Sequence, residues 1–159
     1  MRKNFKDKYG FVICMFFSGI VFIISYNGLD LLGIKIVYYC AYCLILSCTH
    51  EMGHYIMAKL CNIPICKVGF ELYKFFPRAY IKVDLKNSSA KTIIFFYLGG
   101  VLGTFILNLC IVLNIVLFKC NIFDLLSIST ISIVINMIPI YKSDGYYIVK
   151  TLFQNKMAS

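Results

Sequence analysis

The sequence predicts an all-α integral membrane protein with about four transmembrane helices and a possible small β-hairpin in a cytoplasmic loop. The chain is 60% hydrophobic with a mean hydropathy of +0.81, well above the roughly 45–50% apolar usage of soluble domains. Its 159 residues suffice for a single integral membrane domain, residues 1–159. A core of that size cannot bury so much apolar surface, so lipid must be the solvent for much of it.

The net charge of +9 also indicates a membrane. The basic residues lie between apolar runs, as charges that flank membrane spans do. They are not interleaved with exposed aromatic residues along one face, as in a nucleic-acid-binding surface. We therefore expect a lipid bilayer as the partner of this chain, and no nucleic acid.

Four apolar segments have the length of transmembrane helices. Residues 9–26 are uncharged and follow four basic residues. No A-x-A-like cleavage site comes after them, so we expect an uncleaved span rather than a signal peptide. Residues 36–58 form a second segment, interrupted only by a histidine motif. Residues 92–118 form a third, without any charge, and residues 122–141 a fourth, with Asp124 near its start.

Lysine and arginine predict the orientation of these spans. If the N-terminus is cytoplasmic, 14 of the 16 basic residues fall in cytoplasmic segments and only Lys35 and Lys119 lie outside. This asymmetry follows the positive-inside rule. We therefore predict a multi-pass protein of the cell membrane with both termini in the cytoplasm. The Ile-, Lys- and Asn-rich composition indicates a bacterial source with an AT-rich genome. The cytoplasmic basic residues are Arg2, Lys3, Lys6, Lys8, Lys59, Lys67, Lys74, Arg78, Lys82, Lys86, Lys91, Lys142, Lys150 and Lys156.

Residues 61–91 form the one long polar connection. Apolar and polar residues alternate loosely on both sides of Pro77, which predicts two short strands. Such a hairpin could bind an extended peptide at its edge, but a plain surface hairpin is the interpretation we favour. Beyond Gly145, residues 146–156 predict a short amphipathic helix at the cytoplasmic surface.

The chain has two histidines, His50 and His54, and both belong to the sequence His-Glu-Met-Gly-His. Residues four apart share a helix face, so both imidazoles can bind one metal ion. Glu51 lies beside them and can take a proton from a metal-bound water. The alternative is a set of local hydrogen bonds among interfacial polar residues. Ionisable groups inside a span are costly and therefore indicate function, which favours the metal site.

A catalytic zinc ion takes three protein ligands and keeps one position for water. Without a third histidine, the remaining ligand must be a carboxylate or a cysteine such as Cys48. The chain's other carboxylates are Asp7, Asp30, Glu71, Asp84, Asp124 and Asp144. In the predicted topology His50 lies toward the cytoplasmic face, whereas Asp30 and Asp124 lie near the opposite one. Asp144 follows the fourth span at its cytoplasmic end, and Gly145 beside it permits an unusual backbone turn. Asp144 is therefore the predicted third ligand.

Two separated motifs carry a family resemblance. The His50–His54 motif in one span, followed far downstream by "NMIPIYKSDG", resembles the site-2 protease family of intramembrane zinc metalloproteases (peptidase family M50). The second signature of that family, N-x-x-P-x-x-x-x-D-G, is matched by Asn136, Pro139, Asp144 and Gly145. The resemblance covers residues 36–150. It implies a three-helix metalloprotease core in the second, third and fourth spans, with the first span as an addition.

The resemblance implies a zinc metalloendopeptidase that cleaves membrane-embedded or short membrane-associated peptides. His50, His54 and Asp144 would bind Zn²⁺. Glu51 would act as general base toward the zinc-bound water and return the proton to the leaving amine. Asn136 would bind the unwound backbone of a transmembrane peptide substrate. A hydrogen bond between helices is the alternative role for Asn136.

The sequence departs from the family in two places. The middle core helix of the family often has a G-P-x-x-N-like element, whereas "LGGVLGTFILN" has Val101 and Thr104 in place of proline and asparagine. Ser143 precedes Asp144 where leucine is usual. Both departures concern substrate clamping and leave the metal ligands unchanged.

A different class of function is a non-proteolytic zinc-binding membrane protein, such as a transporter, an immunity protein or an accessory protein. A transporter is expected to place ionisable groups along a path through several spans. Here they concentrate at one level beside a general base, which favours hydrolysis.

Overall fold

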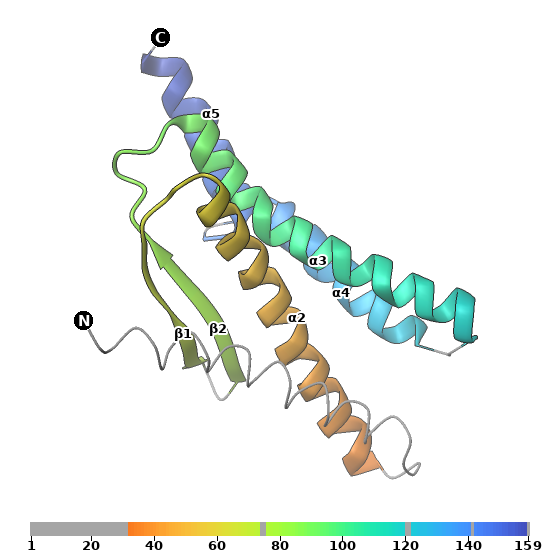
Figure 1. Ribbon diagram of the computed structural model, residues 1–159. Helices are drawn as coiled ribbons and strands as arrows, with labels where there is room; N and C mark the ends of the chain where they lie inside the picture. Colours follow the sequence, from red (N-terminus) through yellow and green to blue (C-terminus); the bar gives the residue numbers. More distant parts are fainter. Residues whose placement is uncertain (1–31, 74–75, 120–121, 141, 159) are drawn as a thin grey trace. The chain divides into compact units, whose positions relative to one another are not determined.

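The structure is a computed structural model that describes residues 32–73, 76–119, 122–140 and 142–158 (Figure 1). This part of the chain is mostly helical, with four helices and one two-stranded sheet in the order α2, β1, β2, α3, α4, α5. The predicted first span, residues 9–26, lies outside the described residues. The chain forms two compact units: residues 32–48 with 66–82, and residues 49–65 with 83–158.

The first unit contains the first part of helix α2 (Leu32–Leu60) and most of strands β1 (Ile65–Tyr73) and β2 (Phe76–Val83). A two-residue connection joins the strands, and so short a connection allows only antiparallel pairing. The predicted hairpin is thus confirmed, but Pro77, on both sides of which the two strands were predicted, does not lie between them. Pro77 is the second residue of β2. Both strands of a two-stranded sheet are edge strands, which tolerate proline.

Helix α3 (Ala90–Phe118) belongs to the second unit and contains the predicted third span. It begins at an N-cap, because the Ser89 side chain accepts a hydrogen bond from the Thr92 N–H at 3.2 Å. Its 29 residues extend over about 43 Å at 1.5 Å per residue. Among the described residues it is the one helix long and apolar enough to cross a membrane. The multi-pass topology stays a prediction.

Helix α4 (Phe123–Met137) is shorter than the predicted fourth span, which extended to residue 141. The helix ends because Ile138 is extended, with φ −68° and ψ 134°, as expected for a residue directly before a proline. Its 15 residues are fewer than the roughly 20 that a transmembrane helix needs. Four full-length transmembrane helices are therefore not supported by the described residues.

Helices α3 and α4 lie side by side in the second unit (Figure 1). A polar cluster connects them: Ser129 Oγ donates to Asn108 Oδ1, and Asn108 Nδ2 donates to Thr130 Oγ1 at 3.3 Å. Hydrogen bonds of this kind hold helices together where the surroundings are apolar.

The last turns of α2 approach α3 with no side chain between their backbones. A Cβ atom added to Gly53 would collide with the carbonyl oxygen of Gly99, and one added to Gly103 with the carbonyl oxygen of Thr49. Small residues at such positions let two helix backbones come close. The close approach brings the histidine motif of α2 against the face of α3.

Candidate metal centre

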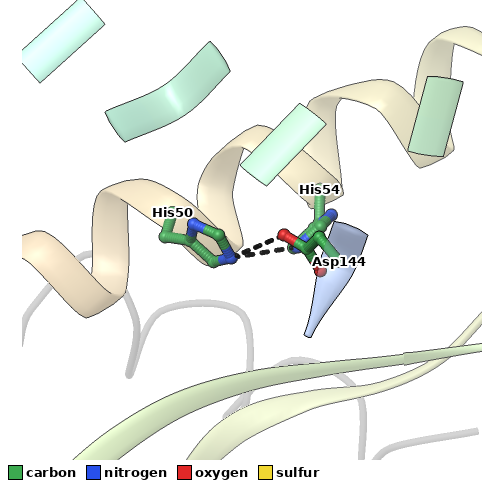
Figure 2. Close-up of side chains that lie close together, drawn as sticks. All are labelled: His50, His54 and Asp144. Atoms are coloured by element: carbon green, nitrogen blue, oxygen red, sulfur yellow. Dashed lines mark hydrogen bonds and ion pairs between the residues drawn. The ribbon is translucent and has the colours of Figure 1, made fainter. Parts of the chain in front are cut away.

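Three side chains from two helices converge on one point. His50 and His54 lie one turn apart on α2, and Asp144 is the first residue of helix α5 (Asp144–Ala158). Asp144 Oδ2 lies 3.1 Å from His50 Nε2 and 3.4 Å from His54 Nε2. The two Nε2 atoms lie 3.3 Å apart. Figure 2 shows the three side chains pointing toward one another.

The size of this triangle fits a tetrahedral zinc ion. Zinc bonds to nitrogen and oxygen are about 2.0–2.2 Å long, so two ligand atoms at a tetrahedral angle lie roughly 3.3–3.5 Å apart. The three observed separations run from 3.1 to 3.4 Å. His50, His54 and Asp144 are also the one group of this kind that could hold a metal ion among the described residues.

The surroundings of the triangle leave lone pairs on His54 Nε2 and Asp144 Oδ2 directed toward its centre. His54 Nδ1 lies 2.8 Å from the carbonyl oxygen of Phe96. Because a carbonyl can only accept, Nδ1 carries the proton and the Nε2 of the neutral ring presents a lone pair. Asp144 Oδ2 is buried and receives no hydrogen bond from any described residue. Acceptor atoms that face one another out of water repel unless a cation lies between them, so the donor set fits a metal ion.

The Asp144 carboxyl is in the charged form that a metal requires. Burial raises its pKa, but protons on the imidazoles of His50 and His54, in the place where a metal ion would bind, stabilise the carboxylate and lower the pKa to about 2. Asp144 is therefore ionised at neutral pH. Metal ligands of this type bind when deprotonated.

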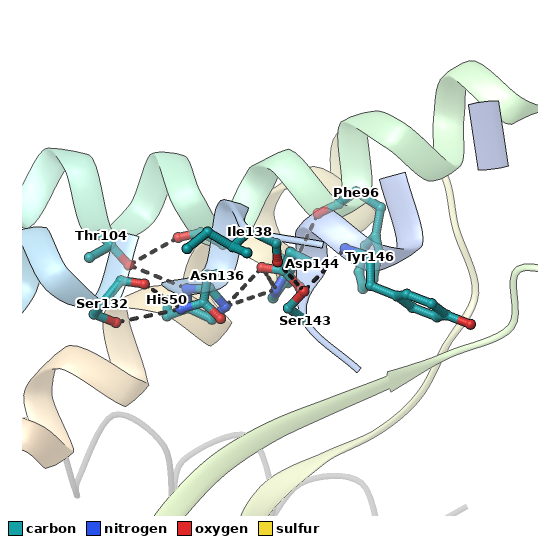
Figure 3. Close-up of polar contacts among 11 residues, drawn as sticks. His50, Phe96, Thr104, Ser132, Asn136, Ile138, Ser143, Asp144 and Tyr146 are labelled. Atoms are coloured by element: carbon teal, nitrogen blue, oxygen red, sulfur yellow. Dashed lines mark hydrogen bonds and ion pairs between the residues drawn. The ribbon is translucent and has the colours of Figure 1, made fainter. Parts of the chain in front are cut away.

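The start of α5 fixes the position of Asp144. Ser143 Oγ accepts a hydrogen bond from the Tyr146 N–H at 3.1 Å and so caps the helix. The same hydroxyl lies 2.7 Å from the carbonyl oxygen of Ile138, which connects the cap to the end of α4 (Figure 3). The departure from the family pattern at Ser143 is thus a helix cap in this chain.

Gly145 has a different role from the predicted one. No glycine in the described residues has a positive φ, so Gly145 does not provide an unusual turn. A Cβ atom at this position would instead collide with the carbonyl oxygen of Met137. The absence of a side chain lets the first turn of α5 pack against the last turn of α4.

Helix α3 contributes two residues to the centre that the sequence did not identify as part of it. A Cβ atom on Gly100 would meet the Nε2 atoms of both His50 and His54. Thr104, only 1% exposed, places its hydroxyl 3.3 Å from His50 Nδ1. Gly100 and Thr104 are four residues apart, as are the two histidines, and this shared spacing was the available signal.

The remaining predicted residues lie outside the triangle. Glu51 is half-buried on α2 next to His50 and is not one of the three converging ligands. Asn136 donates through Nδ2 to the carbonyl oxygen of Ser132, 2.9 Å away within α4 (Figure 3). This bond lies within one helix rather than between helices. The substrate-binding role of Asn136 stays a prediction.

Three further carboxylates, Glu71, Asp84 and Asp124, are not among the three converging ligands. Glu71 Oε1 pairs with Arg78 on the hairpin at 3.3 Å, where both side chains are largely exposed. Asp84 Oδ1 accepts a hydrogen bond from the Lys86 N–H at 3.1 Å. Asp124 lies in the first turn of α4, where a negative charge stabilises the helix.

No protein-family model, curated protein or solved structure matches this chain.

Proposed function

We propose that the protein is an intramembrane zinc metalloendopeptidase of the site-2 protease type that hydrolyses membrane-embedded or short membrane-associated peptides. The observation that carries the proposal is the convergence of His50 Nε2, His54 Nε2 and Asp144 Oδ2 at separations of 3.1–3.4 Å. These residues come from the two sequence motifs that resemble the family. The resemblance and the geometry therefore point to the same three side chains.

The donor set favours zinc over calcium or magnesium. Two imidazoles and one carboxylate, with a fourth position left for water, are typical of catalytic zinc sites. When bound, zinc would supply a Lewis acid that polarises the scissile carbonyl and lowers the pKa of water to about 7. Calcium and magnesium prefer sites built from oxygen ligands.

Glu51 is the residue that would hold and transfer protons. It is next to His50 in the sequence and is not one of the three converging ligands. As a general base it would accept a proton from the attacking water and then donate it to the leaving amine. Asn136, near the end of α4, would hydrogen-bond the substrate backbone after its helix has unwound.

The membrane setting is part of the proposal. Helix α3 is long and apolar enough to cross a bilayer, and large apolar side chains are exposed along it, among them Leu102, Phe105, Ile106, Leu109 and Leu113. Such side chains are stable when lipid covers them. We propose a multi-pass cell-membrane protein with cytoplasmic termini, in which α2, α3 and α4 form the catalytic core.

Substitution of Glu51 tests this function. The full-length protein, purified in detergent and loaded with zinc, would be incubated with casein and with a tagged single-span polypeptide. We expect peptide products that vanish on addition of 1,10-phenanthroline and in Glu51→Gln. A glutamine side chain cannot accept the water's proton, so this variant should retain zinc while losing cleavage by at least 100-fold, the scale of general-base catalysis.

Two results would contradict the proposal. Cleavage by Glu51→Gln at the wild-type rate would remove Glu51 from the chemistry. Zinc binding by the wild-type protein with no cleavage of either probe would favour the non-proteolytic class, a zinc-binding transporter, immunity protein or accessory protein.

A further inference from the structure

One face of α3 meets both histidines of the centre. Phe96, Gly100 and Thr104 are spaced four residues apart and so lie along one face of the helix. The carbonyl oxygen of Phe96 contacts His54 Nδ1 at 2.8 Å, and the Thr104 hydroxyl contacts His50 Nδ1 at 3.3 Å. Gly100, between them, faces the Nε2 atoms of both rings. Figure 3 shows Thr104 and Phe96 on either side of His50 and Asp144.

The Thr104 hydroxyl has an acceptor for its own proton within α3. Thr104 Oγ1 donates to the carbonyl oxygen of Gly100 at 3.2 Å, one turn earlier in the same helix. A hydroxyl has a single proton. With its proton in that bond, the oxygen accepts toward His50 Nδ1, and the proton of that contact comes from the imidazole.

We propose that Thr104 is a positioning residue that holds His50 in the tautomer with Nδ1 protonated, so that Nε2 presents its lone pair to the metal. Histidines that bind metals commonly donate their other ring N–H to a nearby acceptor, which fixes both the tautomer and the ring orientation. The consequence for catalysis depends on the proposed function. The assignment of the tautomer does not depend on that function.

The two histidines differ in how their acceptors can be removed. The acceptor of His54 is a backbone carbonyl, which every residue at position 96 provides. The acceptor of His50 is a side chain, so a substitution at position 104 can delete it. Valine has nearly the shape of threonine and lacks the hydroxyl, and the site is almost fully buried. Thr104→Val should therefore release His50 and leave His54 as an internal control.

The tautomers can be read by NMR of full-length protein labelled with ¹⁵N-histidine. The chain contains only two histidines, so all ring-nitrogen signals come from four atoms. The measurement uses Asp144→Asn without metal, at a pH where both rings are neutral, because this removes the carboxylate that favours a proton on Nε2. We expect both rings to carry the proton on Nδ1. Adding Thr104→Val should shift His50 toward the Nε2-protonated form, and Thr104→Ser should restore it.

Two results would overturn the inference. One is a His50 ring that carries its proton on Nε2 in the Asp144→Asn protein with Thr104 present; this measurement does not depend on whether a position-104 variant folds. The other is a folded Thr104→Val protein whose His50 signals are unchanged.

Zinc affinity provides a second readout, with Asp144 in place. Thr104→Val should weaken binding by about 10–100-fold, the usual effect of removing a partner of a metal ligand, whereas Thr104→Ser should stay near wild type. Equal affinities for the Val and wild-type proteins would contradict the positioning role. Nδ1-protonated rings in Asp144→Asn, together with a wild-type protein that binds no zinc, would support the tautomer assignment and overturn the proposed function.

Discussion

Each imidazole of the centre has one nitrogen bonded to α3 and the other directed at Asp144. His54 Nδ1 donates to the Phe96 carbonyl, and His50 Nδ1 meets the Thr104 hydroxyl. The remaining nitrogens and Asp144 Oδ2 form a buried group, with side chains only 14%, 6% and 11% exposed for His50, His54 and Asp144. In such surroundings water cannot compensate the lone pairs, so a cation stabilises the group strongly.

Gly100 lies where a larger side chain would disturb this group. In Gly100→Ala the new methyl would overlap both Nε2 atoms, so the rings must move and the ligand triangle must widen. We expect zinc affinity to fall by at least tenfold, comparable to loss of a supporting hydrogen bond. Isothermal titration with zinc would measure it. Leu102→Ala is the control because Leu102 is 50% exposed on the same helix; equal affinities for the two variants would show that Gly100 does not face the metal.

Some residues of the centre could be predicted from the sequence and others could not. The spacing of His50 and His54 specifies a shared helix face, and predicted topology selected Asp144 among the carboxylates. Thr104 was noticed only as a departure from a family motif, because its contact with His50 depends on how α3 is rotated. The carbonyl of Phe96 has no sequence signal at all, since every residue carries one.

The helix ends position the third ligand. Ser143 caps α5 and directly precedes Asp144. Loss of the cap should therefore destabilise the start of the helix and make the position of the Asp144 carboxylate less well fixed. We expect Ser143→Ala to lower the free energy of unfolding by about 1 kcal/mol and to weaken zinc binding measurably. Ser143→Thr retains the hydroxyl and should behave as wild type in thermal unfolding and zinc titration. An unchanged Ser143→Ala protein would show that the cap does not support the centre.

The contact between α2 and α3 depends on glycine backbones. In Gly53→Ala the added methyl would meet the carbonyl of Gly99, which is backbone and cannot rotate away. Forcing an extra carbon into such a contact destabilises by about 1–3 kcal/mol, measurable by unfolding in detergent. Ile56→Ala is the matched control, because Ile56 is 50% exposed on the same helix. Equal stabilities of both variants would contradict close packing at Gly53.

The sequence predicted which segments form helices and strands better than it predicted where those elements begin and end. The hairpin was expected from alternation, but Pro77 lies within β2 rather than between the two strands, because alternation does not specify where an edge strand begins. The predicted fourth span extended to residue 141, past the end of α4. Hydropathy alone does not show that Pro139 disfavours a helical backbone conformation at Ile138.

The proposed arrangement in the membrane rests on charge and helix length. Helix α3 would carry the chain from the cytoplasm to the outside, because the loop before it is basic and only Lys119 follows it closely. A reporter fused after residue 87 should therefore give a cytoplasmic signal, and one fused after residue 121 an external signal. Both reporters on the same side of the membrane would contradict a crossing by α3.

If His50, His54 and Asp144 hold one zinc ion, the metal content of Asp144→Asn is the most direct test. The purified wild-type protein should contain about one zinc per chain by mass spectrometry of the metal. Asp144→Asn should lose zinc by at least tenfold in affinity, since a direct ligand matters no less than its supporting partners. The control is Asp84→Asn, whose carboxylate accepts a hydrogen bond from the Lys86 N–H in its own loop, and it should retain the metal. A wild-type protein without bound metal, or an Asp144→Asn protein with as much zinc as Asp84→Asn, would contradict the assignment.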